Sequence, residues 1–403
     1  MDALALTLVL ATVFLWGVFS AKAQSAWLLS TPIVFVSSGF ILTEVSVLDL
    51  HPDHETVKTI AEVTLVWVLF SDAAAVDPHK LRADLSMYLR LLGIGLPLTV
   101  GLGALLAMTL LGLNFWAALL VGAALAPTDA ALGAAVMTNP RVSSHIRRVL
   151  NVESGLNDGV VTPVVLLAIA GVATDLGIEG VHAPSRAALS LLMGLLVGVT
   201  LGAMGGLLTC TARRRGWLAE GVAGPAVLAL ALMSYTCAVL VDGNGFVAAF
   251  VGGIAFGSTA GARREHEISY VEETAGLSSM IAWLVFGAVV LPDIGSWLDW
   301  RLLLYALLSL TLIRMVPVFL SLQGTGTSAR DAAFIGWFGP RGLASIIFAL
   351  LALESLKGEA HELVSVIGLT VLFSVVAHGL SAGPLASRLG TAKSAMPAGT
   401  IEG

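Results

Sequence analysis

Apolar stretches long enough to cross a membrane recur along the whole chain. A helix needs about 20 apolar residues to cross a hydrocarbon core about 30 Å thick, and shorter helices are tolerated within a bundle. Because lipid offers the backbone no hydrogen-bond partners, each stretch must bond internally, as a helix does. We therefore predict an all-α polytopic membrane protein with about 13 transmembrane helices. The stretches are residues 3–20, 26–44, 57–76, 89–110, 115–138, 149–172, 186–209, 220–241, 245–259, 270–291, 301–321, 331–353 and 361–383.

Charged residues are scarce and unevenly placed. They make up 12% of the chain, which is roughly half of their share in soluble domains. If the N-terminus lies outside, 15 of the 21 Lys and Arg residues fall on the cytoplasmic side and four on the outer side. This is the asymmetry that the positive-inside rule describes. We predict a protein of the prokaryotic inner membrane with its C-terminus in the cytoplasm, in contact with membrane lipids and without a nucleic-acid partner.

The fifth and twelfth stretches each contain a proline closely followed by a charged residue: Pro127 with Asp129, and Pro340 with Arg341. Proline breaks a helix, and a break inside the membrane is tolerated only where it is buried in protein or lines a cavity. Asp129 can offset the positive N-terminal ends of half-helices, and Arg341 the carbonyls at their C-terminal ends. The two stretches cross in opposite directions. This predicts an inverted repeat, helices 1–6 against 8–13, with two broken crossing helices.

The sixth stretch begins with four polar side chains. Ser154 and Asp158 are four residues apart and share one helix face, while Glu153 and Asn157 share the adjoining face. We expect Asp158 to meet Asp129 where the fifth and sixth helices cross. Carboxylates, a hydroxyl and freed carbonyls are the ligands of hard cations. The sequence therefore predicts a cation site halfway across the membrane.

Buried charges inside the membrane need partners or a water-filled cavity. Glu153 faces away from the predicted cation site, and Arg341 is the natural candidate to pair with it. His378, on the thirteenth stretch, is expected to be a satisfied packing residue rather than a pH sensor. An intramembrane hydrolase would need a serine nucleophile paired with a histidine base, and the sequence has no such motif. We expect no enzymatic activity and no cofactor.

Five motifs resemble those of the cation:proton antiporters related to bacterial NhaP-type and animal (NHE-like) sodium/proton exchangers. The segment Glu153-Ser-Gly-Leu-Asn-Asp158 is similar to their sixth-helix signature. The other four are similar to their third, fifth, eleventh and twelfth helices, in the expected order. They are Leu69-Phe-Ser-Asp-Ala73, Pro127-Thr-Asp129, Arg314 and Phe338-Gly-Pro-Arg-Gly342.

The resemblance implies a role for each matching residue. Asp158 would bind cation and proton in turn, and Asn157 would support the crossing of the fifth helix. Asn157 stands where related exchangers carry a second aspartate, which implies electroneutral exchange of one cation for one proton. Asp72 is either an acid of the access funnel or an interfacial residue. The implied Na⁺ site consists of Asp158, Asp129, Ser154 and the backbone of Thr128. The implied supports of the helix breaks are Pro127, Pro340 and Arg314.

The resemblance also implies a division of the chain and a homodimer. The dimer would form through helices outside the transport core. The predicted parts are scaffold helices 1–3 (1–76), core helices 4–6 (77–172), linker and dimerisation helices 7–10 (173–300), core helices 11–13 (301–388) and a short cytoplasmic tail (389–403).

The predicted function is secondary active transport, in which Na⁺ is exchanged for H⁺ by alternating access. Li⁺ and K⁺ are further candidates for the cation. A Na⁺-coupled symporter of a small organic anion is the alternative. It would require uptake of the anion together with Na⁺.

Overall fold

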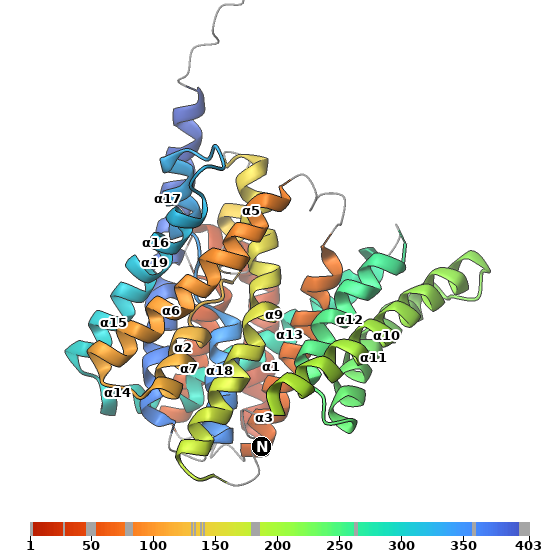
Figure 1. Ribbon diagram of the computed structural model, residues 1–403, viewed down its shortest axis with the longest axis horizontal. Coiled ribbons are helices and arrows are strands. Elements are labelled where there is room, and N and C mark those ends of the chain that lie inside the picture. Colours follow the sequence, from red (N-terminus) through yellow and green to blue (C-terminus); the bar gives the residue numbers. More distant parts are fainter. Residues whose placement is uncertain are drawn as a thin grey trace, which may run out of the picture.

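The computed structural model describes residues 3–26, 29–45, 54–76, 84–129, 132, 134–137, 139, 142–178, 186–261, 265–356 and 360–394. The regular elements of these residues are all helices (Figure 1). Two of them, η1 and η2, are π-helical turns. The elements are α1 (Ala3–Ala26), α2 (Thr31–Glu44), α3 (His54–Ala75), α5 (Leu85–Arg90), η1 (Leu91–Gly95), α6 (Leu96–Leu106), η2 (Ala107–Leu111), α7 (Phe115–Ala124), α8 (Ala134–Met137), α9 (Ser144–Asp175), α10 (Ala187–Arg214), α11 (Glu220–Leu240), α12 (Gly245–Thr259), α13 (Glu265–Val289), α14 (Leu291–Trp297), α15 (Trp300–Leu310), α16 (Leu312–Ser321), α17 (Ala329–Trp337), α18 (Leu343–Ser355) and α19 (His361–Ser394).

Each predicted apolar stretch contains a helix. Within the described residues, seven helices are long and apolar enough to cross a membrane, and four shorter apolar helices accompany them. The fifth stretch is divided into α7 and α8, and the twelfth into α17 and α18, so the two predicted breaks are confirmed. α19 continues to Ser394, beyond the predicted start of the tail, and 395–403 lie outside the described residues. The chain is an integral membrane protein.

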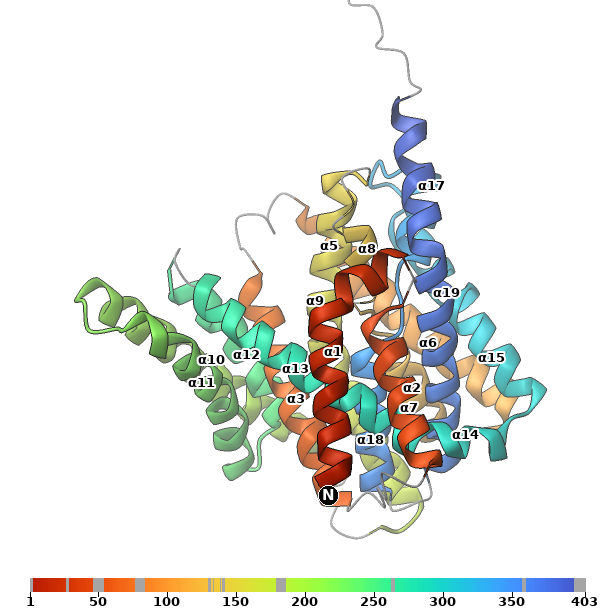
Figure 2. The same cartoon turned by 180° about the vertical axis from the view of Figure 1, so that it is seen from behind.

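Helices α2, α3 and α10–α13 pack against one another, and α1 packs on α2; we call these helices the scaffold group. In Figure 2 they lie on the left and in the front centre. Their backbones approach closely at glycines. A side chain at Gly202 would overlap the backbone of Gly252 on α12, and one at Gly287 would overlap that of Val36 on α2. Such contacts hold helices together by van der Waals packing where lipid leaves no hydrophobic drive for association.

Helices α5–α9 and α15–α19, with η1 and η2, form a second body that we call the core group, and the short α14 contacts both α13 and α19. The pairs α6–α7, α7–α9, α15–α19 and α18–α19 are in contact. α18 is buried along nearly its whole length, because it lies between the other core helices and the scaffold group. It contacts α3 and α13, and α9 contacts α3 and α12. We call this contact between the two groups the seam.

Candidate functional site

The two helix breaks meet at Asp129. Its backbone N–H donates to the Pro340 carbonyl at 2.8 Å, and its Oδ2 accepts from the backbone N–H of Leu343 at 2.8 Å. Leu343 is the first residue of α18, so the aspartate caps the N-terminal end of a half-helix, where negative charge is favoured. A side chain at Gly342 would overlap the Asp129 carboxylate. The sequence predicts that Asp129 offsets the N-terminal end of a half-helix, and its contact with Leu343 agrees with this prediction.

Arg341 is completely buried and lies against backbone carbonyls. Its Nη1 donates to Ala126 at 3.1 Å, and more weakly to Pro127 at 3.5 Å, while its Nη2 donates to Ser309 at 3.3 Å. Ala126 follows the end of α7, and Ser309 lies in the last turn of α15. The guanidinium therefore offsets the negative ends of half-helices, as the sequence predicts.

The predicted pairing of Glu153 with Arg341 is wrong. Glu153 Oε1 accepts from Nη2 of Arg314 on α16, at 2.6 Å, and both residues are at most 3% exposed. Arg341 is held at the carbonyls of the two breaks instead. Arg314, which the resemblance implies as a support of the helix breaks, instead pairs with Glu153, the buried acid of α9.

A buried polar network joins the fifth and sixth predicted helices. Asn157 Nδ2 donates to Thr128 Oγ1 at 2.8 Å, and Thr128 Oγ1 lies 2.9 Å from Ser154 Oγ. All three side chains are buried. Asn157 thus ties α9 to the break of the fifth span, where we predict its role. Thr128 makes these contacts with its hydroxyl, whereas the resemblance implies that its backbone binds the cation.

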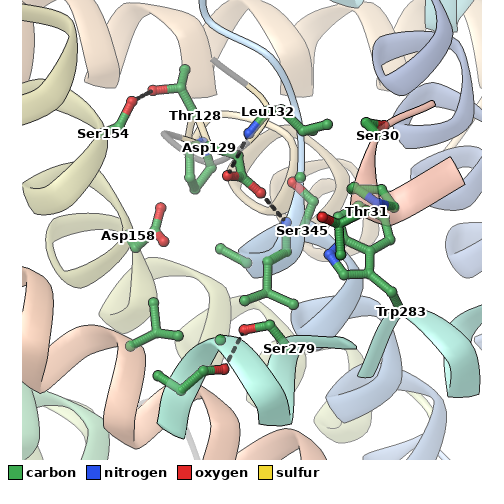
Figure 3. Close-up of a pocket in the computed structure, with 18 of the residues that line it drawn as sticks. Ser30, Thr31, Thr128, Asp129, Leu132, Ser154, Asp158, Ser279, Trp283 and Ser345 are labelled. Carbon is green, nitrogen blue, oxygen red and sulfur yellow. Dashed lines mark hydrogen bonds between the residues drawn. The ribbon is translucent and has the colours of Figure 1, made fainter. Parts of the chain in front are cut away.

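A cavity of about 700 Å³ exposes the predicted cation-binding side chains. Thr128, Asp129, Ser154 and Asp158 line it together (Figure 3). Asp158 is 7% exposed, and its Oδ1 has no hydrogen-bond partner among the described residues. A buried carboxylate oxygen without a donor is costly unless a cation or proton joins it. The cavity is therefore lined by a carboxylate that is suited to bind one or the other.

Two further acids line the wider part of the cavity. Asp72, near the end of α3, is partly buried, and Glu272, near the start of α13, is exposed. This position of Asp72 supports an access funnel rather than an isolated interfacial acid. Glu272 is absent from the predicted site. Its only signal in the sequence is a pair of acids, Glu272 and Glu273, at the edge of an apolar stretch.

The other side of Asp158 is closed by packing. Gly159 lies against the ring of Phe250 on α12, and a side chain there would overlap the ring. Val161 and Val165, about one and two turns further along α9, are buried. The part of α9 that follows Asp158 is therefore packed among other side chains.

A family model described as "Sodium/hydrogen exchanger, transmembrane" matches residues 5–388. The chain belongs to the sodium/hydrogen exchanger family. This membership confirms the resemblance found in its motifs, and it places the chain among transporters rather than enzymes.

The relatives of this member of the family include two bacterial proteins. The K(+)/H(+) antiporter NhaP2 of Shewanella sp. (strain MR-4) is 27% identical over 337 residues, which cover 82% of this chain and 58% of the relative. The K(+)/H(+) antiporter NhaP of Alkalimonas amylolytica is 26% identical over 396 residues, which cover 96% and 67%. This chain thus spans little more than half of the length of the Shewanella relative.

The fold also matches a solved structure. The sodium proton antiporter MjNhaP1 from Methanocaldococcus jannaschii at pH 8 superposes with a TM-score of 0.81 and 21% sequence identity, over 96% of this chain and 98% of that one. The match supports the all-α antiporter fold that the hydropathy pattern predicts.

Proposed function

We propose that this chain exchanges a monovalent cation for a proton across the membrane, with cation and proton competing for Asp158. The observation that carries the proposal is the buried Oδ1 of Asp158, which has no hydrogen-bond donor among the described residues, while Asp158 lines a cavity that Asp129 also lines. Na⁺ is the cation that the sequence motifs favour. K⁺ and Li⁺ are the alternatives, and K⁺ is the cation in the names of the bacterial relatives.

The charges around the site support a one-to-one, electroneutral exchange. Five ionisable side chains either bond to the breaks, form the adjacent ion pair or are proposed to bind the cation, namely Glu153, Arg314, Arg341, Asp129 and Asp158. Asp72 and Glu272, which also line the cavity, are left out of this sum. With every group ionised, their net charge is −1. One bound monovalent cation or one proton neutralises it. The core group would then cross its barrier in two neutral states, whereas the empty site would carry an uncompensated charge through a medium where charge is costly.

Movement along the seam would give alternating access. The cavity lies between α9 and α18 of the core group and α2, α3 and α13 of the scaffold group. A shift of the core group against the scaffold group would close the cavity and open the packed side near Phe250. Relative movement of two bodies around a central site is common among transporters.

We further propose a homodimer in a prokaryotic inner membrane, with the N-terminus outside and the C-terminus in the cytoplasm. The large apolar side chains of α1 and α10, such as Leu10, Phe14 and Leu208, are exposed and are available to lipid or to a second subunit. In this orientation the cavity opens to the cytoplasm, because α3 ends near Asp72 on that side.

Proteoliposomes with an imposed pH gradient test the proposed exchange. Addition of Na⁺, K⁺ or Li⁺ should collapse the gradient, and lower pH should raise the apparent KM for the cation with little change in maximal rate. Asp158→Asn should abolish exchange while the protein still folds. Asp84→Asn is the matched control, because Asp84 pairs with Arg148 and His145 away from the cavity. Exchange by the Asp158→Asn variant would contradict the proposal. Uptake of an organic anion with Na⁺, without proton flux, would favour a symporter.

A further inference from the structure

Two buried side chains of α19 contact the break of the twelfth span. Ser374 Oγ accepts from the backbone N–H of Arg341 at 2.6 Å. His378 Nε2 lies 2.8 Å from the carbonyl oxygen of Trp337, the last residue of α17. Ser374 Oγ and His378 Nδ1 are 3.2 Å apart. The two side chains thus connect one side of the break to the other.

The connection ends at two backbone groups, the N–H of Arg341 and the carbonyl of Trp337. The break keeps these two groups from bonding to each other. In a continuous helix, the N–H of Arg341 would donate to the carbonyl of Trp337, four residues earlier. Here α17 ends at Trp337 and α18 begins at Leu343, and the N–H of Arg341 turns to Ser374 instead. The side chains of Ser374 and His378 therefore take the place of one missing helical hydrogen bond.

The hydrogen-bond roles follow from the donors available. Because Ser374 Oγ accepts from Arg341, its own hydrogen is free to point to His378 Nδ1. This assigns the neutral tautomer with hydrogen on Nε2, which donates to Trp337. A hydrogen on Nδ1 would point instead to the Ser374 carbonyl, 2.9 Å away, and would leave the Trp337 carbonyl without a donor. We assign the tautomer from this network of contacts.

The hydrogen bonds of Ser374 and His378 are buried away from water. Ser374 and His378 are at most 1% exposed, and the rings of Trp337 and Phe338 flank the imidazole at 5.2 and 6.4 Å between centroids. A buried polar group that loses its partner there cannot turn to water, so the break would rearrange. The affected segment leads directly to Leu343, whose N–H holds the Asp129 carboxylate.

We propose that Ser374 and His378 form a clamp that fixes the shape of the twelfth-span break and so positions Asp129 for cation binding. They are positioning residues, since they act through the backbone at Trp337 and Arg341. The effect on cation binding rests on the proposed function, whereas the effect on the break itself does not. The two parts therefore call for two measurements.

Hydrogen–deuterium exchange of the purified full-length protein measures the clamp directly. Ser374→Ala removes the contact with Arg341, and His378→Met removes the contact with Trp337; each also removes the contact between the two side chains. The amides of residues 338–343 should exchange at least about tenfold faster in both variants. Thr370→Val is the matched control, because Thr370 is equally buried on α19 and its hydroxyl donates to the carbonyl of Val366 in its own helix. If the three variants give the same exchange rates at the break, the clamp is refuted.

Cation exchange in proteoliposomes measures the consequence. His378→Met should raise the apparent KM for Na⁺ about tenfold with little loss of maximal rate, whereas Thr370→Val should leave KM unchanged. His378→Gln, which keeps an amide donor near Trp337, should recover most of the affinity. A His378→Met variant with normal KM would overturn the positioning role. A wild-type protein without cation/proton exchange would refute the proposed function instead, and the deuterium measurement would still decide on the clamp.

Discussion

Removing the acid of the buried Glu153–Arg314 pair should destabilise the protein strongly. In the Glu153→Ala variant, the guanidinium of Arg314 would stay buried, at 1% exposure, without the carboxylate that lies 2.6 Å from its Nη2. Its Nε already has no hydrogen-bond partner among the described residues, so the remaining charge would be poorly solvated. Breaking such a pair costs about 3–5 kcal/mol.

This free energy corresponds to a measurable change in melting temperature. For a chain of 403 residues, each kcal/mol shifts the melting temperature by roughly 1 °C. Thermal unfolding in detergent, followed by intrinsic tryptophan fluorescence, should therefore show a decrease of about 3–5 °C for Glu153→Ala.

A second substitution identifies the partner of Glu153. Replacing both members of a buried pair by apolar residues is often neutral or stabilising. Adding Arg314→Met to Glu153→Ala should therefore restore much of the lost stability. Adding Arg341→Met should lower stability further, because the carbonyls of Ala126 and Ser309 would lose their donor. An unchanged melting temperature for Glu153→Ala, or rescue by Arg341→Met, would refute this reasoning.

Three further predictions follow from the contacts described above. Lys58→Gln removes a partly exposed ion pair with α18 and should change the melting temperature by less than about 1 °C, in contrast to the buried pair. Gly342→Ala places a methyl group against the Asp129 carboxylate and should abolish exchange in proteoliposomes; a normal rate would show that the break can rearrange. Single cysteines at Arg214 and Arg301 should react with a membrane-impermeant thiol reagent from opposite sides, and reaction from the same side would exclude the predicted topology.

The sequence is most informative where a physical rule leaves one solution. A long apolar stretch in lipid must be helical, so hydropathy predicts the helices and their order. A proline next to a charge in such a stretch predicts a buried break, and the structure shows both breaks. The charges of Asp129 and Arg341 match opposite ends of half-helices, which is a local electrostatic rule.

The sequence fails where several partners could satisfy the same rule. Glu153 needed a buried cation, and both Arg314 and Arg341 were available. The choice depends on which guanidinium reaches the carbonyls that the breaks release, and this depends on the packing of α7 and α15. Similarly, Glu272 reaches the cavity only because α13 crosses near α3, and no local pattern encodes that crossing.

The glycine contacts of the scaffold group have a consequence for how such a transporter can vary. At Gly202 and Gly287 one backbone lies against another, so any larger residue would separate two helices. Across the seam, Gly159 meets the ring of Phe250 instead of a backbone. A change in side-chain size at this contact would therefore meet a phenyl ring and would not separate helices inside either group. Backbone contacts thus fix the spacing of helices within the scaffold group, whereas a side chain sets the spacing at this point of the seam.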